Sequence, residues 1–289
     1  VNGMKKRKNK YNRVQEMVID FISISIVVVA VVMVILNIDI EILSGENEMV
    51  NSINSIEEKK NKGILSNGYT GEGMGENAYS KYNNVDKGKL IETETVEGTY
   101  FENSVFLGDS RTVAMKELGI LESANTFSVN GINHIDFISQ IFFDNITGIT
   151  GDIFEIVAAR KPDKIYVALG VNGVSFIQKD LFIEKYNELI ERLIEASPDS
   201  KIIIESILPV NENTYTGSNK NLTNKNIDEM NIELLEISEN RGVYFLDISD
   251  ALKNEENSLA IQYDCGDGLH FTKEGYEAVF EEICKYGVD

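Results

Sequence analysis

The sequence predicts an α/β domain with a central parallel sheet over residues 101–289. Two observations carry this prediction: short, nearly continuous apolar runs rich in β-branched residues, and amphipathic helical patterns between these runs. Such runs are typical of strands buried on both faces, and strands that alternate with helices form parallel sheets. A third observation, a long uncharged apolar run near the N-terminus, predicts a transmembrane helix ahead of the domain.

The first 43 residues have the organisation of a signal anchor. Six positive charges precede the first acid, Glu16, and residues 21–36, FISISIVVVAVVMVIL, carry no charge. With their apolar flanks they form a segment, residues 17–43, long enough for a helix to cross a bilayer. The positive-inside rule makes residues 1–16 a basic cytoplasmic tail and predicts a single-pass protein of the cell membrane with an extracytoplasmic C-terminal domain. A cleaved signal peptide is the alternative, but no A-x-A-like site or lipobox Cys follows the run.

Residues 44–100 are predicted to be a flexible extracytoplasmic stem, because apolar residues are sparse and stretches such as NGYTGEGMGENAYSKYNN are rich in Gly, Asn and Ser. The formal net charge of −20 argues against a nucleic-acid partner, which would require a basic face. Residues 101–289 hold 15 Lys and Arg against 33 Asp and Glu, a net charge of −18 that disfavours polyanionic substrates. Two His and two Cys, widely spaced, match no common zinc pattern, so no metal or cofactor is expected.

Five apolar runs predict the strands of the sheet. In chain order they are SVFLGDS, ANTFSVNG, KIYVALGVN, KIIIESILPV and VYFLDIS. Helices are predicted over residues 111–118, 134–143, 151–160, 180–196, 224–241 and 273–286. Ligand sites in such sheets lie beyond the carboxyl ends of the strands. Four residues with this position are Ser110, Gly131, Asn172 and Pro209.

Acyl transfer needs a nucleophile, a base, a group that orients the base, and donors for the oxyanion. Ser110 lies in the turn between the first strand and its helix, where it is the candidate nucleophile and is also expected to cap the helix. DGLHFT supplies Asp267 and His270, whose i, i+3 spacing lets the carboxylate bend back onto the imidazole. Gly131 in SVNGIN can approach a ligand closely, and the amide of Asn172 in ALGVNG can donate to an oxyanion.

These residues resemble the four blocks of the SGNH family, also called GDSL-type esterases and lipases. Ser110 stands in FLGDSRT, Gly131 in VNG, Asn172 in GVNG and His270 in DGLHFT. The resemblance implies a three-layer α/β/α, flavodoxin-like fold and a serine hydrolase acting on ester bonds. It also implies a catalytic triad of Ser110 as nucleophile, His270 as base and Asp267 as orienting group. The Ser110 N–H, the Gly131 N–H and the Asn172 side chain would form the oxyanion hole.

The resemblance covers residues 101–289, with two departures from the usual pattern. Arg111 stands where the first block commonly has Leu, and Gly173 stands where the third block usually has Asp. That Asp supports the loop, so its loss puts the pose of Asn172 in question. A structural ion pair is the expected role of Arg111, and binding an anionic substrate group is the alternative.

Three further residue types receive structural interpretations. Asp109 is expected to be a turn or cap residue. His134 is expected at a helix start or on the surface, with a place in the pocket as the alternative. Cys265 and Cys284 both lie beyond residue 260, and outside the membrane they could form a disulfide that pins the catalytic loop to the last helix. The sequence leaves that pairing open.

The leading hypothesis is a membrane-anchored bacterial esterase that removes small O-acyl groups, acetyl being the expected one, from a cell-surface glycan. Its partners would be an acylated carbohydrate or another small ester, and the membrane through the N-terminal helix. An O-acetyltransferase with the same triad is the second hypothesis, and it would require a membrane acyl-donor partner. Lysophospholipase or thioesterase activity would require a long apolar groove. A non-catalytic glycan-binding module is opposed by the intact set of site residues.

Overall fold

The structure is a computed structural model that describes residues 85–86 and 88–288. All of these residues belong to one compact unit, residues 74–289. The predicted basic tail and signal anchor, and residues 44–84 of the predicted stem, lie outside the described residues. Within the part of the chain that is described, no helix combines the length and the apolar character that a membrane span requires.

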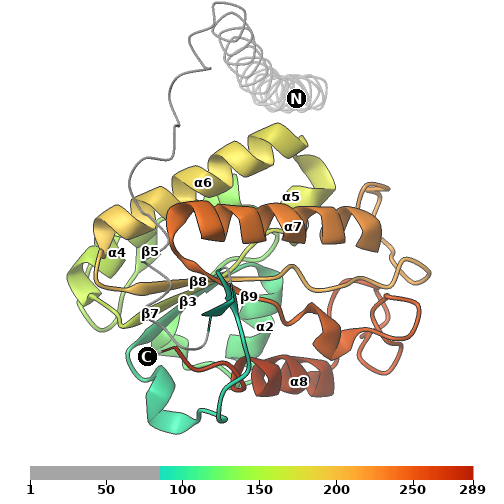
Figure 1. The fold of residues 1–289 in the computed structure, drawn as a ribbon, viewed down its shortest axis with the longest axis horizontal. Helices are drawn as coiled ribbons and strands as arrows, with labels where there is room; N and C mark the ends of the chain where they lie inside the picture. Colours follow the sequence, from blue (N-terminus) through green and yellow to red (C-terminus); the bar gives the residue numbers. More distant parts are fainter. Residues whose placement is uncertain (1–84, 87, 289) are drawn as a thin grey trace, which may run out of the picture. The chain divides into compact units, whose positions relative to one another are not determined.

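Seven strands form one sheet in the order β1-β2-β9-β8-β7-β3-β4 (Figure 1). The six strands from β2 to β4 in this order are parallel, and β1 adds an antiparallel edge. Their bounds are β1 Val85–Asp86, β2 Lys89–Leu90, β3 Ser104–Gly108, β4 Thr126–Ser128, β7 Lys164–Ala168, β8 Lys201–Glu205 and β9 Tyr244–Leu246. The predicted α/β fold with a central parallel sheet is confirmed.

Helices cover both faces of this sheet, and a small hairpin stands beside it (Figure 1). The α-helices are α2 Ser110–Glu117, α3 His134–Phe137, α4 Ile153–Arg160, α5 Val171–Phe176, α6 Lys179–Ala196, α7 Asn224–Arg241 and α8 Lys273–Ile283. Short 3₁₀ helices are η2 Gly98–Phe101, η3 Ser123–Asn125 and η4 Ser249–Leu252. The hairpin pairs β5 Phe142–Phe143 with β6 Thr150–Gly151.

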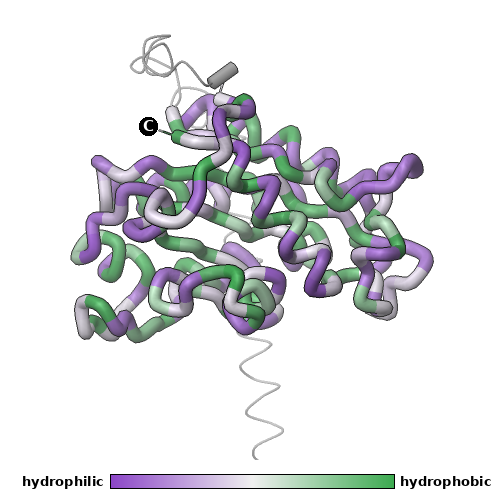
Figure 2. The backbone as a smooth tube through the Cα atoms, turned by 90° about the horizontal axis from the view of Figure 1, so that it is seen from below, coloured by the Kyte–Doolittle hydropathy of each residue, from purple (hydrophilic) through white to green (hydrophobic). Residues whose placement is uncertain are grey.

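Alternate residues of the central strands enter two separate hydrophobic cores. In β7, Ile165 and Val167 pack with apolar residues of α4, α6 and α7, whereas Tyr166 packs with apolar residues of α2 and α8. This period of two is the pleat of a strand buried on both faces. Figure 2 shows the result, with hydrophobic stretches running through the interior and hydrophilic ones concentrated on the outside.

Residues 134–143 do not form the single helix that the sequence predicts. α3 ends at Phe137, and the chain then enters the β5–β6 hairpin. Asp144 stabilises the turn of this hairpin, because its fully buried carboxylate accepts the N–H groups of Ile146 and Thr147 at 3.1 Å and pairs with Arg160 at 2.6 Å. A side chain that satisfies its own turn in this way offers the backbone an alternative to the helix.

The sheet also begins before residue 101, the predicted start of the domain. Leu90 of β2 is 2% exposed, and Lys89 pairs with Phe245 in β9. Beyond β2, the Thr93 N–H donates to Lys285 O at 2.8 Å, and the Tyr100 hydroxyl donates to Val288 O at 3.1 Å. Residues 88–100 are therefore part of the folded domain. A strand of two residues has no periodicity that a sequence pattern could reveal.

Candidate active site

Ser110 follows the carboxyl end of β3, the fully buried strand between β7 and β4. The N-cap of α2 is Asp109, whose side chain accepts the Arg111 N–H at 3.0 Å. Asp109 is therefore the capping residue, and the prediction that Ser110 caps the helix was wrong. Since Ser110 is the first residue of α2, its hydroxyl stays available for other contacts, and its N–H belongs to the first turn, whose N–H groups lack helical acceptors.

The loop before α8 brings a carboxylate and an imidazole to Ser110. His270 Nε2 lies 2.9 Å from Ser110 Oγ, and His270 Nδ1 lies 2.7 Å from Asp267 Oδ2. The other oxygen of Asp267 accepts the backbone N–H groups of Leu269 and His270, both at 2.8 Å. Burial disfavours the ionised carboxyl, but these hydrogen bonds, led by that of the imidazole, outweigh it and lower the pKa of Asp267 to about 2. Asp267 is therefore a carboxylate at neutral pH and holds the imidazole in one orientation.

Gly131 and Asn172 follow the neighbouring strands β4 and β7. Gly131 has φ of +73° and is exposed, and a Cβ built on it would meet open space. The positive φ, rather than crowding, is what favours glycine here. Asn172 lies in the first turn of α5, and its Nδ2 donates to Ile132 O at 2.9 Å, next to Gly131. One N–H of the amide thus ties α5 to the loop after β4, and the second remains for a ligand.

All five residues that the sequence singled out therefore surround the same edge of the sheet. Ser110, Asp267 and His270 form one hydrogen-bonded chain. Gly131 and Asn172 follow the strands on either side of β3, and the Asn172 amide links their two loops. A hydroxyl bonded to an imidazole, which is in turn held by a carboxylate, can deliver an activated oxygen nucleophile.

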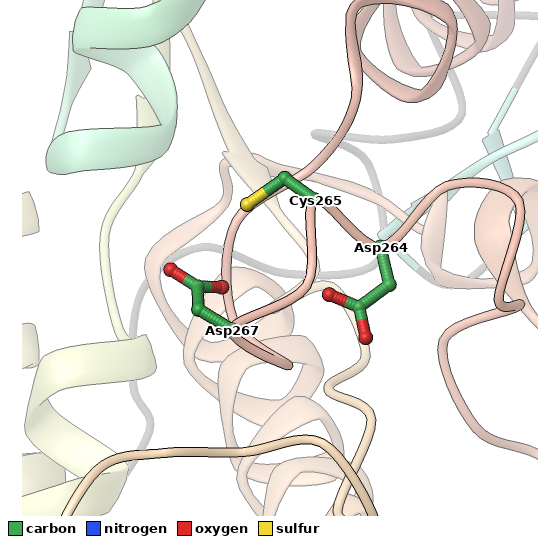
Figure 3. A group of neighbouring side chains, drawn as sticks. All are labelled: Asp264, Cys265 and Asp267. Atoms are coloured by element: carbon green, nitrogen blue, oxygen red, sulfur yellow. The ribbon is translucent and has the colours of Figure 1, made fainter.

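A group of possible metal ligands, Asp264, Cys265 and Asp267, lies in the same loop (Figure 3). Asp264 already accepts the N–H groups of Gly266 and Gly268 at 2.8 and 3.0 Å, together with hydrogen bonds from Asn211 and Thr214. Burial opposes ionisation of Asp264, but these bonds outweigh it and lower its pKa. With Asp267 committed to His270, these carboxylates build the loop, and the group does not fit a metal centre.

Cys265 and Cys284 are both free thiols. Cys265 is exposed in the loop of His270, while Cys284 is 8% exposed at the C-cap of α8. The disulfide that the sequence left open is therefore not formed. Partial loss of solvent around the sulfur raises the pKa of the Cys265 thiol, and the negative charge of Asp267 raises it further, so Cys265 carries a neutral thiol beside the carboxylate.

A small cavity of about 40 Å³ is lined by Asp109 and Arg111, the two neighbours of Ser110, and not by Ser110 itself. Glu205, at the end of β8, lines it and is 6% exposed, and its carboxyl makes no hydrogen bond to another described residue. Burial, with a smaller contribution from Asp109, raises the pKa of Glu205 to about 8. The cavity has room for water, which could satisfy this neutral carboxyl. No sequence pattern singled out Glu205, because it reads as the polar end of a strand.

Residues 106–278 match the sequence profile of the GDSL-like Lipase/Acylhydrolase family. This match covers more than half of the chain and includes Ser110, Gly131, Asn172, Asp267 and His270. The chain belongs to the GDSL-like lipase and acylhydrolase family. Membership of this family implies ester hydrolysis. A search of the curated proteins finds no match.

Solved structures resemble the fold of this GDSL-family domain. A Streptococcus pneumonia structure described as a platelet activating factor protein has a TM-score of 0.50 at 23% identity, covering 63% of this chain and 81% of the other. An acylhydrolase structure from Bacteroides fragilis has a TM-score of 0.50 at 19% identity, covering 66% and 88%. A GDSL-like lipase from Bacteroides thetaiotaomicron has a TM-score of 0.49 at 19% identity, covering 65% and 89%. At these identities the likeness concerns the fold alone.

Gly173, one of the two departures from the GDSL pattern, lies against two buried rings. A Cβ at this position would lie 2.6 Å from Phe182 Cε2 and 3.0 Å from His134 Cε1. His134 begins α3 as expected, but it is fully buried rather than on the surface, and its Nε2 lies 3.1 Å from Phe182 O. Burial lowers the pKa of His134 to about 4, although the contact with Phe182 O opposes the shift. The imidazole is therefore neutral and supports the site by packing.

Arg111, the other departure, makes no ion pair with any residue that the structure describes. Each hydrogen bond of its guanidinium goes to a backbone carbonyl. It is 7% exposed, so it cannot reach a substrate in solvent. The expected structural ion pair of Arg111 is therefore absent among the described residues, and its four hydrogen bonds to carbonyls, rather than an anion, account for its guanidinium. Only the fold, which brings distant carbonyls to this side chain, reveals its contacts.

Proposed function

We propose that this GDSL-family chain is a serine esterase that removes small O-linked acyl groups, acetyl above all, from a glycan. The observation that carries the proposal is the continuous chain from Ser110 Oγ to His270 Nε2 at 2.9 Å and from His270 Nδ1 to Asp267 Oδ2 at 2.7 Å. Both distances lie within hydrogen-bond reach of a nucleophile and its base.

In the proposed mechanism, Ser110 Oγ attacks the carbonyl carbon of the ester while its proton passes to His270 Nε2. The tetrahedral intermediate collapses, the C–O bond to the sugar breaks, and the imidazolium returns the proton to the departing sugar hydroxyl. Water then attacks the acyl-Ser110 ester, giving its proton to His270, and the carboxylic acid leaves as Ser110 recovers its proton. Asp267 stays ionised throughout and stabilises the imidazolium.

The oxyanion of both intermediates would be held by the N–H groups of Ser110 and Gly131 and by the Asn172 amide. The positive end of the α2 dipole would also strengthen the hydrogen bond from the Ser110 N–H to the oxyanion. Preorganised donors of this kind commonly contribute a factor of about 10²–10³ each to kcat. The bond from Asn172 to Ile132 O fixes the amide beside Gly131 before substrate arrives.

A carbohydrate substrate is favoured by a cavity of about 300 Å³ whose wall mixes polar and apolar side chains. Amide, hydroxyl and carboxylate groups line it together with Leu259, Ala260 and Ile261, and no Lys or Arg is among its lining residues. Two amides at its rim, Asn213 and Gln262, are exposed and make no side-chain hydrogen bond to another described residue. Such groups can donate to and accept from sugar hydroxyls. With the acidic composition of the domain, this favours a neutral glycan over a polyanion.

The cavity is connected to the candidate active site through the backbone. Asn211 and Thr214 in its wall hydrogen bond to Asp264, and Asp264 holds the turn on either side of Asp267 through Gly266 N and Gly268 N. The proposal requires that a sugar chain longer than the esterified residue reach this cavity while its ester lies at Ser110.

The test is hydrolysis of p-nitrophenyl acetate and p-nitrophenyl octanoate by the full chain and by Ser110→Ala, followed by acetate release from acetylated glycans. Activity that is lost in Ser110→Ala and favours acetate is expected. A preference for octanoate would favour a lysophospholipase or thioesterase, and transfer of acetyl to an added sugar would favour the transferase. Equal background rates for both proteins would contradict the esterase proposal.

We also propose that residues 17–43 anchor the enzyme in the cell membrane with residues 101–289 outside. The support is the uncharged run preceded by a basic tail. In membrane fractions, the full chain should resist extraction with carbonate, and protease added to intact spheroplasts should digest the domain. Release of the protein by carbonate would contradict the anchor.

A further inference from the structure

Arg111 follows the candidate nucleophile directly and is buried in the first turn of α2. Its guanidinium donates four hydrogen bonds to three carbonyls. Leu269 O receives two of them, from Nε at 3.1 Å and Nη2 at 2.9 Å. Leu208 O accepts from Nη1 at 2.9 Å and Pro209 O accepts from Nη2 at 3.0 Å. The side chain thus joins the helix of the nucleophile to the segment after β8 and to the loop before α8.

The contacts within that last loop fall on both sides of the candidate base. Leu269 precedes His270 and is held through its carbonyl, while Phe271 follows His270 and lies under the guanidinium, 4.5 Å from Cζ of Arg111 to the ring centroid. A planar fork of donors can grip a carbonyl and stack on an aromatic ring at the same time, which neither Lys nor Leu can do. The residue next to Ser110 therefore holds both neighbours of His270.

We propose that Arg111 is a positioning residue that sets the distance and angle between Ser110 Oγ and His270 Nε2. The inference rests on the proposed function, since it assigns a role within the same Ser110–His270–Asp267 reaction. Leu, the residue more common in this position of the family motif, would leave the buried carbonyls of Leu208 and Pro209 and the half-buried carbonyl of Leu269 without these donors. The loop could then relax, and a displacement of about 1 Å at reacting groups is enough to reduce the rate about 10²-fold.

The chain offers a control in Arg160, although its replacement also leaves the buried carboxylate of Asp144 without its cation. Its guanidinium is also buried, it donates to Ala124 O, Asn125 and Asp144, and it lies over the ring of Phe127 at 5.1 Å. These contacts secure the turn after β5 and make no contact with the loop of His270. Replacing either arginine removes buried hydrogen bonds and a cation that lies over an aromatic ring. Only the contacts of Arg111 involve the two neighbours of His270.

The experiment compares Arg111→Leu, Arg111→Lys and Arg160→Leu in the full chain, measuring Tm together with kcat and KM for p-nitrophenyl acetate. All three variants should have a lower Tm. Only the Arg111 variants should lose kcat, by about 10²-fold for Leu and less for Lys, with KM changed by no more than a few-fold.

Retention of kcat within about 3-fold in Arg111→Leu would overturn the inference, as would an equal loss of kcat in Arg160→Leu at the same fall in Tm. If the wild-type chain has no Ser110-dependent esterase activity, the proposed function fails instead. The positioning inference is then decided by crystal structures of the wild type and Arg111→Leu. A hydrogen bond between Ser110 and His270 that persists unchanged without the guanidinium would refute it.

Discussion

Gly173→Ala adds a single methyl group beside the candidate oxyanion hole and should destabilise the domain. The new Cβ would lie 2.6 and 2.9 Å from two ring carbons of Phe182 and 3.0 Å from His134 Cε1. Both rings are fully buried, so neither can move out into solvent. Overpacking costs about 1–3 kcal/mol, and two contacts under 3.0 Å with a ring that cannot move favour the upper part of this range, about 2–3 kcal/mol. The better helix propensity of Ala returns at most about 1 kcal/mol, because Gly173 lies within α5.

The net loss of about 1–2 kcal/mol corresponds to a fall in Tm of roughly 2–8 °C for a domain of this size. The kcat for p-nitrophenyl acetate should fall as well, because Asn172 precedes the new methyl group and would be displaced from Ile132 O. Gly173→Asp, which restores the usual family residue, should be worse because it also buries a carboxylate without an arranged partner.

Thermal unfolding followed by circular dichroism, with steady-state kinetics on the same samples, measures both effects. Phe182→Leu makes room for the methyl group, so the double variant Gly173→Ala/Phe182→Leu should show a favourable coupling energy in a double-mutant cycle. An unchanged or raised Tm in Gly173→Ala, or a coupling energy of zero, would refute the reasoning that the two rings exclude a side chain at this position.

Three further outcomes follow from the structure. Asn213→Ala and Gln262→Ala should raise the KM for an acetylated oligosaccharide several-fold and leave the KM for p-nitrophenyl acetate unchanged. The control Asn240→Ala, at an exposed position of α7, should change neither KM. Equal effects on both substrates would contradict a sugar-binding cavity. Glu205→Gln should stabilise the protein by up to about 3 kcal/mol at pH 7 and little at pH 4, as measured by urea unfolding. The reason is that the pKa of Glu205 is raised to about 8 in the folded state, so the wild type loses stability as pH rises from about 4.5 to 8. The depressed pKa of Asp267 contributes stability above about pH 4 that is lost as pH falls toward 2, and Asp267→Asn should flatten this part of the stability curve; an unchanged acid limb would show that the carboxylate is not stabilised by its hydrogen bonds.

Local patterns were sufficient to predict five strands of the sheet, and four sequence blocks taken together singled out the residues of the candidate triad. The strands are buried on both faces, so their apolar runs are continuous in the sequence, and Asp267 and His270 are near enough in the chain for their spacing to predict their contact. Ser110 was singled out because ligand sites in parallel sheets generally lie beyond the carboxyl ends of the strands, where Ser110 follows β3.

Contacts between distant segments account for what the sequence did not predict. The acceptors of Arg111 lie 97 to 158 residues away in the chain, so no spacing could reveal them. The turn of the hairpin after α3 is stabilised by Asp144 meeting Arg160, and the burial of His134 depends on Phe182. The strand β2 is too short to carry a pattern and is stabilised by pairing with β9. In each case tertiary structure overrides the local propensity.

The hydrogen bonds between residues 93–100 and residues 284–288 bring the two ends of the domain together. Domains whose ends meet commonly tolerate circular permutation. A linker from the C-terminal end to the segment that leads into β2, with new ends opened at the exposed residues 217–218, would keep every strand and helix intact. Asp267 and His270 would then precede Ser110 along the chain. Because such a triad is defined by geometry rather than by chain order, the permuted protein should keep its chemistry.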